Sequence, residues 1–259
     1  MKEKIQKLCK QIEKKYKIKI LFAIENGSRA WRMESENSDY DVRFVFMHPK
    51  KEYLQLTSPT DVINETYDKQ GNPCQPEGAF IDIVGFDIFK FCKLLTSSNP
   101  TTIEWLISDI VYLGKQNKAL QTYARKQFHP VALYFHYQSM CKNNYLKYIK
   151  SKQEVTYKKY LYALRGLVNA TWVFHKKSIP PIKFTEALDG LQETMPESVR
   201  TKVKEIIALK KEGKEKDIVQ NIVQFDQYIE HFLKLQPIFP EQQKKNIESI
   251  NKELQKLLK

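Results

Sequence analysis

The chain has 259 residues, of which 42% are hydrophobic and 12% aromatic, so it is long enough to bury a sizeable core. No stretch approaches the roughly 20 apolar residues that span a bilayer, and four scattered cysteines form neither a disulfide framework nor a zinc pattern, so we expect a cytoplasmic protein with reduced thiols. The net charge of +13 is concentrated in residues 114–183, which hold 14 Lys or Arg and one acid, and this block is a candidate surface for a polyanion.

The first elements in chain order are a helix and two strands. Residues 1–17 carry frequent charges and apolar positions at helical spacing, which predicts an amphipathic helix on a sheet and not a secretory signal. The apolar runs 18–24 and 42–47 predict two buried strands. Because alternate side chains share a face of a strand, Asp39, Asp41 and Arg43 should point the same way.

Two carboxylates on one strand face repel each other unless a cation joins them. A hard divalent ion with oxygen ligands is the usual solution, which makes Asp39 and Asp41 candidate magnesium ligands. Gly27-Ser28, after the preceding strand, can turn backbone N–H groups and a hydroxyl toward phosphate oxygens. A solvated strand edge is the simpler alternative for the two acids, and the Gly-Ser pair at this distance favours the metal site.

The pattern after these strands predicts a helical piece at 50–56, strands at 61–67 and 78–84, and helices at 86–96 and from Asn99-Pro100 to 108. Asp82 is a polar residue in an apolar run, which requires a partner and makes it a candidate third carboxylate. Asp87 is the competing acid, although it also suits the N-terminus of the following helix. A strand at 110–113 would close the edge of the sheet.

From Lys115 onward the pattern predicts helices without strands. They are expected at 116–127, 130–150, 155–176, 183–191, 196–212, 216–235 and 240–258. The fold class is therefore α+β, with a small mixed-sheet domain at 1–113 followed by an all-α helical domain at 114–259.

The basic block interleaves cations with tyrosines, which are the ingredients of single-strand nucleic-acid binding. Helical spacing places His136, Asn143 and Lys147 on one helix face. It places Lys158, Tyr162 and Arg165 on a face of the next helix, and these two polar faces could line a cleft facing the carboxylates. Arg165 lies in an otherwise apolar helix, so its guanidinium needs an anion, either a carboxylate of this protein or a triphosphate. A buried interhelix histidine and solvated lysines are the simpler alternatives.

The segment GSRAW followed by SDYDVR carries a family resemblance. This pattern resembles the signature of the polymerase-beta-type nucleotidyltransferase superfamily, which consists of Gly-Ser, a ten-residue gap and Asp, a hydrophobic residue and Asp, here Asp-Tyr-Asp. The surrounding residues are similar to the YcgL-type predicted nucleotidyltransferases, which include an RNA-ligase-associated branch. The resemblance continues at 82–106, 136–145 and 159–172, and it departs at Arg32 or Met33, where that family tends to carry glycine.

The resemblance implies a nucleotidyltransferase domain that moves a nucleoside monophosphate from an NTP, such as ATP, to an acceptor hydroxyl. Two Mg²⁺ ions, or Mn²⁺, would be held by Asp39, Asp41 and Asp82. The expected nucleotide-binding residues are Gly27, Ser28, Arg29, Arg43, Tyr162 and Arg165, of which Arg43 could equally be an internal counter-ion for Asp41. The expected nucleic-acid-binding residues are His136, Asn143, Lys147, Lys158 and Lys159.

An RNA end, in repair or processing, is the expected acceptor because the basic block suits a polyanion. A protein hydroxyl, as in nucleotidylating toxin–antitoxin systems, is the main alternative. Transfer to a cationic small molecule such as an aminoglycoside is disfavoured by the same block. A non-catalytic RNA-binding protein is disfavoured by the intact acidic residues.

Overall fold

The computed structural model describes residues 1–152, 154–240 and 246–259, which fall into two compact units. The first, here called the sheet unit, holds residues 1–30, 38–128 and 246–259. The second, the helical unit, holds residues 31–37 and the described residues from 129 to 240. The predicted domain boundary at 113 therefore divides the chain differently from these two units.

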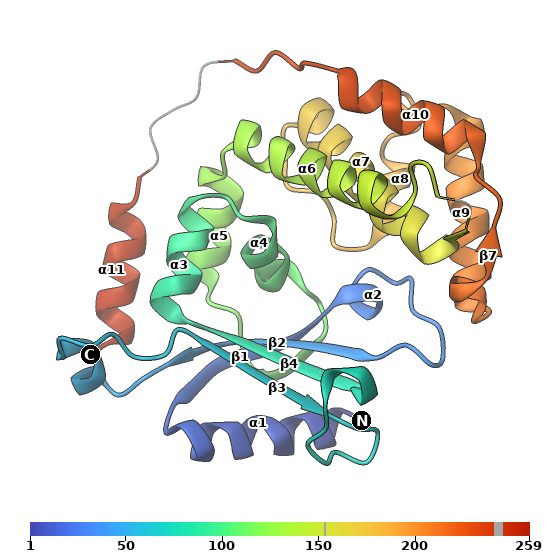
Figure 1. Cartoon of the computed structure of the whole chain (residues 1–259). Helices are drawn as coiled ribbons and strands as arrows, with labels where there is room; N and C mark the ends of the chain where they lie inside the picture. Colours follow the sequence, from blue (N-terminus) through green and yellow to red (C-terminus); the bar gives the residue numbers. More distant parts are fainter. Residues whose placement is uncertain (153, 241–245) are drawn as a thin grey trace. The chain divides into compact units, whose positions relative to one another are not determined.

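A five-stranded mixed sheet forms the centre of the sheet unit (Figure 1). Its order is β3-β4-β2-β1-β5, with β2 and β4 parallel and the other neighbours antiparallel. The strands are β1 (Lys19–Asn26), β2 (Tyr40–Met47), β3 (Val62–Tyr67), β4 (Ile81–Asp87) and β5 (Val111–Gly114). The mixed α/β fold class is confirmed, and β5 closes one edge of the sheet.

Helix α1 (Lys2–Tyr16) covers one face of this sheet. Its Ile5, Leu8 and Ile12 are buried in a core that includes Val42 and Phe44 of β2. Burial of this apolar stripe stabilises a helix whose remaining surface is charged. The predicted N-terminal amphipathic helix is therefore confirmed.

Helices α3 (Ile88–Thr96) and α4 (Pro100–Ile107) cover the opposite face of the sheet (Figure 1). Phe22 of β1 meets Phe91 of α3 edge to face at 5.9 Å, and Phe86 of β4 stacks on Trp105 of α4 at 4.6 Å. Helix α4 begins as predicted, because Asn99 accepts a cap hydrogen bond from the backbone N–H of Thr101.

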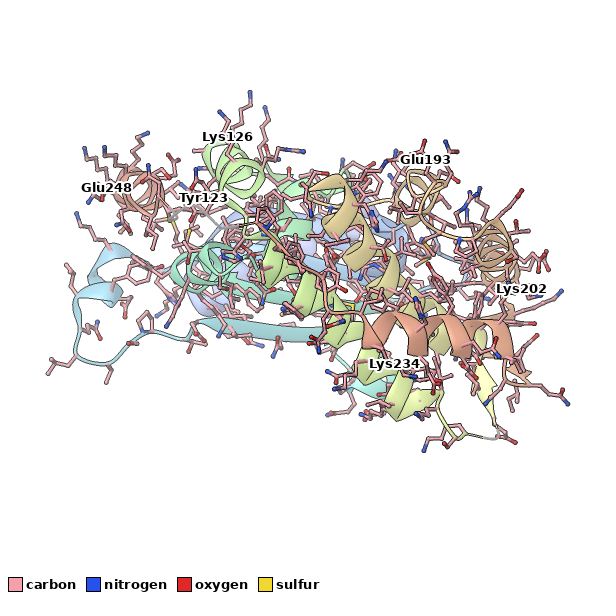
Figure 2. The ribbon with its side chains drawn as sticks, turned by 90° about the horizontal axis from the view of Figure 1, so that it is seen from above. Tyr123, Lys126, Glu193, Lys202, Lys234 and Glu248 are labelled. Carbon is pink, nitrogen blue, oxygen red and sulfur yellow. The ribbon has the colours of Figure 1, made fainter. Side chains whose placement is uncertain are left out.

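Two further helices belong to the sheet unit although they follow residue 113. They are α5 (Lys118–Gln127) and α11 (Glu248–Leu257). Figure 2 shows α11, which carries Glu248, beside α5, which carries Tyr123 and Lys126. The side chain of Asn117 at the start of α5 donates a 2.7 Å hydrogen bond to Glu253 of α11, and this bond links the two helices. The last helix was predicted at 240–258, of which 241–245 lie outside the described residues, and the described helix begins at Glu248.

The helical unit is built on two long antiparallel helices that pack closely along their length. Its helices are α6 (Pro130–Tyr148), α7 (Tyr157–Lys176), α8 (Phe184–Asp189), α9 (Glu197–Lys211) and α10 (Val223–Lys234). A Cβ atom added at Gly166 of α7 would lie 2.7 Å from the backbone nitrogen of Cys141 in α6. Gly166 therefore permits the close approach of the two helix backbones.

The prediction of helices alone after residue 115 was wrong. Val155–Thr156 (β6) and Ile218–Val219 (β7) form a small antiparallel sheet in the helical unit. Two-residue strands are too short for a periodic pattern, and both lie near the starts of the helices predicted at 155–176 and 216–235. The helix expected at 216–235 accordingly begins only at Val223. Among the helices that the structure describes, none is long and apolar enough to cross a membrane.

The boundary between strand β4 and helix α3 lies two to three residues later than predicted. The strand continues to Asp87, which pairs with Phe46 of β2. The Asp87 side chain then caps α3 by accepting a hydrogen bond from the backbone N–H of Phe89 at 2.8 Å. The short helical piece expected at 50–56 is a 3₁₀ helix at Lys50–Leu54.

Candidate active site

Asp41 and Asp82 are direct neighbours across the parallel pair of strands β2 and β4. Val42 and Phe44 alternate with Asp41 and pack beneath α1, so the Asp41 side chain emerges on the opposite face. Ile81 packs in the same core, which places Asp82 on that opposite face as well. The two side chains are 25% and 34% exposed, so the structure brings both carboxylates together at one partly buried site.

Arg43 bridges the two carboxylates. Its Nη2 atom donates hydrogen bonds to Asp41 Oδ1 and to Asp82 Oδ2, each at 2.9 Å. Its Nη1 atom donates to the backbone carbonyls of Val42 and Asp82, each at 3.0 Å. The guanidinium, 14% exposed, therefore offsets the repulsion between the two acids, as expected for an internal counter-ion.

Gly27 lies against the Asp41 carboxylate. It has φ 63°, in the left-handed region that favours glycine. A Cβ atom added there would lie 1.8 Å from Asp41 Oδ2, so only glycine fits at this position. The next residue, Ser28, is 7% exposed, and its hydroxyl makes no hydrogen bond within the described part of the chain.

Asp39 and Arg29 lie where the chain enters β2. The Asp39 side chain is exposed, and its carboxylate has no partner among the residues that the structure describes. Arg29 donates from Nε to the backbone carbonyl of Asp39 at 3.0 Å and from Nη2 to that of Ser38 at 2.5 Å. Its guanidinium carbon also lies 3.9 Å from the ring centroid of Tyr40. Arg29 thus holds the start of β2, and its predicted phosphate contact stays a prediction.

Glu25 is a site residue that the sequence analysis missed. It is fully buried on β1, where Oε1 accepts the backbone N–H of Asp41 at 2.9 Å and Oε2 accepts the Tyr112 hydroxyl at 2.5 Å. Burial raises the pKa of Glu25 from 4.5 to about 7, while the two hydrogen bonds lower it. The signal was present, because Glu25 is a charged residue inside an apolar run, as Asp82 is.

The carboxylate pair has the donor chemistry that a divalent cation requires. Asp41 Oδ1 and Asp82 Oδ2 both lie 2.9 Å from one positively charged group, so both can approach one cation from the same side. Across residues 1–152, 154–240 and 246–259, however, no three His, Cys, Asp or Glu side chains are arranged as a metal site. The positions of the Asp41 and Asp82 carboxylates suit a divalent cation. The participation of Asp39 as a third ligand stays a prediction.

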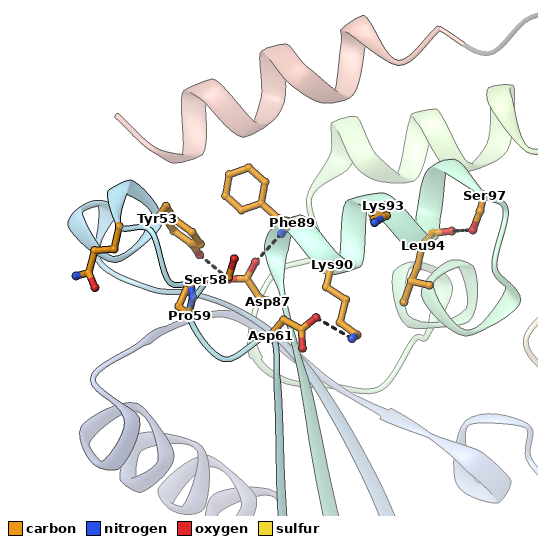
Figure 3. Close-up of a pocket in the computed structure, with 11 residues that line it drawn as sticks. Tyr53, Ser58, Pro59, Asp61, Asp87, Phe89, Lys90, Lys93, Leu94 and Ser97 are labelled. Atoms are coloured by element: carbon orange, nitrogen blue, oxygen red, sulfur yellow. Dashed lines mark hydrogen bonds and ion pairs between the residues drawn. The ribbon is translucent and has the colours of Figure 1, made fainter.

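The competing acid, Asp87, is the last residue of β4, five positions after Asp82, and Figure 3 shows it beside Tyr53 and Phe89. Its carboxylate accepts the Tyr53 hydroxyl at 2.5 Å in addition to the cap hydrogen bond of α3. Asp87 lines a pocket of about 770 Å³, together with Asp61 and Lys90, which form an ion pair at 2.9 Å. Because its hydrogen bonds serve α3 and the 3₁₀ helix, Asp87 is a structural acid and Asp82 is the partner of Asp41.

Two predicted nucleotide-binding residues of the helical unit contact Trp31. The guanidinium carbon of Arg165 lies 3.6 Å from the Trp31 ring centroid, and Tyr162 meets the same ring edge to face at 5.9 Å. Arg165 is 5% exposed, so the aromatic face meets part of its need for a partner. Arg32, one of the two positions where the family resemblance expects glycine, has φ 58°, in the left-handed region that favours glycine.

The predicted nucleic-acid-binding residues lie on α6 and α7. His136 and Asn143 line a shallow pocket of about 500 Å³ on α6, and Lys147 is exposed one turn further along. The Lys159 ammonium lies 3.7 Å from the ring centroid of Tyr148, and the Lys147 ammonium lies 5.0 Å from the same centroid. Lys158 is 3.8 Å from Glu215, which lessens its availability for phosphate. A cleft that joins these residues to the carboxylates concerns both units and stays a prediction.

A paired carboxylate site beside a Gly-Ser turn on a mixed sheet is the arrangement expected of a nucleotidyltransferase. A comparison with family models matches residues 1–258 to the RNA repair pathway DNA polymerase beta family, and the chain belongs to this family. The predicted enzyme class is thereby confirmed: the protein is a nucleotidyltransferase. A Bacillus subtilis (strain 168) relative, called uncharacterized protein YcgL, is 36% identical over 235 residues, which cover 89% of this chain and 84% of the relative.

Two solved structures align with the chain at low similarity. One is the spectinomycin adenyltransferase AAD(9) from Enterococcus faecialis, determined with ATP and spectinomycin, at 11% identity and a TM-score of 0.49, covering 90% of this chain and 98% of that one. The other is a nucleotidyltransferase-like protein from Exiguobacterium sibiricum 255-15, at 11% identity and a TM-score of 0.31, covering 88% and 74%.

Proposed function

We propose that the protein transfers a nucleoside monophosphate from an NTP to a hydroxyl at an RNA end, with Mg²⁺ as cofactor. The observation that carries the proposal is the pairing of Asp41 with Asp82 on adjacent strands, against the Gly27 turn. The RNA acceptor is supported by the one-sided charge of residues 114–183 and by the RNA repair pathway in the description of the family.

The reaction is an in-line displacement at the α-phosphorus of the NTP. The acceptor oxygen forms a bond to this phosphorus, the bond to the bridging oxygen breaks, and pyrophosphate leaves. Asp41 and Asp82, joined by Asp39, would hold the metal, which when bound offsets charge on the attacking and leaving oxygens. Asp82 would accept the proton of the attacking hydroxyl, and Glu25 fixes the backbone from which Asp41 projects.

The nucleotide would be held by groups around the same turn. Ser28 supports this assignment because its buried hydroxyl is not engaged by the described residues. Arg43 can turn Nη2 toward a phosphate oxygen while Nη1 keeps its two backbone partners. We assign the acceptor RNA to the basic helices, through His136, Asn143 and the lysines around Tyr148.

The proposal is tested by incubating the protein with each labelled NTP, with total RNA and total protein as acceptors, with and without Mg²⁺. We expect label in RNA that requires Mg²⁺ and that falls by about 100- to 1,000-fold in Asp41→Asn, because a metal ligand is worth several kcal/mol in the transition state. The matched control is Asp61→Asn, whose carboxylate is 58% exposed and pairs with Lys90.

Three outcomes decide the proposal. Label in RNA that disappears in Asp41→Asn and persists in Asp61→Asn supports it. Label in protein without label in RNA would replace the RNA acceptor by a protein hydroxyl while keeping the transfer chemistry. Equal labelling by the wild type and by Asp41→Asn would refute the assignment of the carboxylate pair.

A further inference from the structure

A second pocket, of about 610 Å³, lies wholly within the helical unit. Its walls come from α6, α7, α10, two residues just before α9 and the segment 235–238 that follows α10. The volume falls in the range of small-molecule sites, which are mostly apolar with a few polar groups. Nucleotidyl transfer as proposed above makes no use of this pocket.

The walls of this pocket are aromatic. Tyr134 of α6 is 2% exposed and contacts Phe174 of α7 and Phe232 of α10, with ring centroids 6.2 Å apart in both pairs. Phe239 closes the cluster at 5.5 Å from both Tyr134 and Phe174. Rings that pack against one another in this way form a rigid apolar surface on which a planar ligand can stack.

Four polar side chains of the pocket make no hydrogen bond with any residue that the structure describes. They are Tyr228, His175, His231 and Gln236, of which the last three are exposed. Burial, aided by two neighbouring lysines, lowers the pKa of His175, so near neutral pH this ring presents one donor and one acceptor. The two threonines of the pocket, in contrast, donate to backbone carbonyls of their own segments.

The charge of the pocket favours an anion. None of its described lining residues is acidic, and the Lys177 ammonium lies 4.4 Å from the Phe174 centroid and 5.0 Å from that of Phe239. The pocket of the sheet unit shown in Figure 3 differs, because two acids line it, Asp87, which accepts the Tyr53 hydroxyl, and Asp61, which pairs with Lys90. A ligand of the helical pocket should therefore be planar, able to form hydrogen bonds at its edge, and negatively charged beside the ring.

We propose that this pocket binds a nucleobase that carries a phosphate, stacked against the aromatic cluster, with its edge hydrogen-bonded to Tyr228 and the two histidines and its phosphate near Lys177. Such a base can belong to a free nucleotide or to an unpaired residue of an RNA. The site is separate from nucleotidyl transfer, since binding here requires neither the carboxylate pair nor a metal.

The test measures binding in EDTA, which removes metal-assisted binding at the carboxylates. The probes are the four nucleoside 5′-monophosphates, ribose 5-phosphate, and a labelled single-stranded RNA of about eight nucleotides. Tyr228→Phe removes only the unused hydroxyl and should weaken binding about five-fold. Its control is Tyr123→Phe, because the Tyr123 hydroxyl is buried in the sheet unit and equally without a partner among the described residues.

Lys177→Gln tests the phosphate contact. Lys177 ends α7 with φ 50°, and Lys17 ends α1 with φ 52°, so Lys17→Gln is a control with the same backbone conformation. We expect Lys177→Gln to weaken binding about five- to ten-fold. It should also reduce the slope of the logarithm of the binding constant against the logarithm of the salt concentration by about one. Lys17→Gln should leave both quantities unchanged.

The outcomes separate the two sources of the base. If the monophosphates bind little and Tyr228→Phe and Lys177→Gln weaken RNA binding, the pocket is assigned to RNA. If the two variants weaken the binding of the monophosphates, the pocket is assigned to a free nucleotide. Ribose 5-phosphate binding as tightly as the monophosphates would overturn the proposal, and so would wild-type affinity in both variants. Loss of labelling in Asp41→Asn has no bearing on these measurements, so the two proposals fail independently.

Discussion

Replacement of Gly27 by alanine probes whether the Gly-Ser turn positions the carboxylate pair. Two separate effects are expected. The φ of 63° is unfavourable for any residue with a Cβ atom, by about 1–2 kcal/mol. The new Cβ atom would also lie 1.8 Å from Oδ2 and 2.6 Å from Cγ of Asp41, so the carboxylate must leave its present position.

The two effects can be separated with Gly213→Ala. Gly213 has φ 86°, and a Cβ atom added there meets nothing within 4 Å. Gly213→Ala should therefore lower the free energy of unfolding by about 1–2 kcal/mol through backbone strain alone and leave catalysis unchanged. Gly27→Ala should lose at least as much stability and also about 100-fold in kcat/KM, the effect of misplacing a reacting group by about 1 Å.

The assay combines urea unfolding with Mg²⁺-dependent transfer of label, measured on both variants at equal folded fraction. If Gly27→Ala keeps kcat/KM within a few-fold of the wild type, the close contact between Gly27 and Asp41 has no part in positioning the carboxylate. If Gly213→Ala loses activity equally, the loss reflects general strain and not the site.

Three further substitutions test the network around the pair. Arg43→Gln leaves two neighbouring carboxylates without their cation, so in EDTA it should lower the free energy of unfolding by about 1–2 kcal/mol after allowance for solvent screening. Mg²⁺ should then restore more stability to this variant than it adds to the wild type. Glu25→Ala should lower the free energy of unfolding in urea by about 2–4 kcal/mol, because a backbone N–H and the Tyr112 hydroxyl lose their buried acceptor. Tyr112→Phe removes a single donor and should lower this free energy by less. Gly85→Ala should lower the free energy of unfolding by about 1–3 kcal/mol, since its Cβ atom would lie 2.2 Å from the Phe44 ring. An unchanged midpoint of urea unfolding would contradict this packing.

The carboxylate pair was predictable because a strand has a fixed period of two residues. Asp41 could be placed on the face opposite Val42 from the sequence alone, and a charged residue in the run of Asp82 indicated a second partner. That the two residues face each other depends on the parallel pairing of β2 with β4, which brings together residues about forty positions apart. The sequence contains no local signal for that register.

Glu25 carries the same signal as Asp82, a charged residue in an apolar run, but its role depends on tertiary structure, which brings the backbone N–H of Asp41 to its carboxylate. Trp31 reads as part of the Gly-Ser motif, yet it packs on Arg165 in the helical unit. The partners of a buried cation are set by tertiary packing, which brings the Trp31 ring against the Arg165 guanidinium, and the anion expected for Arg165 stays a prediction.

Arg43 has two expected roles, counter-ion and nucleotide ligand, and the structure shows the contacts of the first. Its Nη1 atom is fixed by the carbonyls of Val42 and Asp82, which stay in place whatever the carboxylates bind. Only Nη2 contacts the carboxylates, and a divalent ion there would repel it. We infer that the guanidinium stabilises the pair in the free protein and then, still anchored through Nη1, presents Nη2 to the incoming triphosphate. Arg43→Lys distinguishes this from a counter-ion alone, because an ammonium can neutralise the acids but lacks the second fixed nitrogen. The lysine variant should keep the stability of the wild type in EDTA and raise the KM for the NTP about ten-fold, whereas an unchanged KM would limit Arg43 to its counter-ion role.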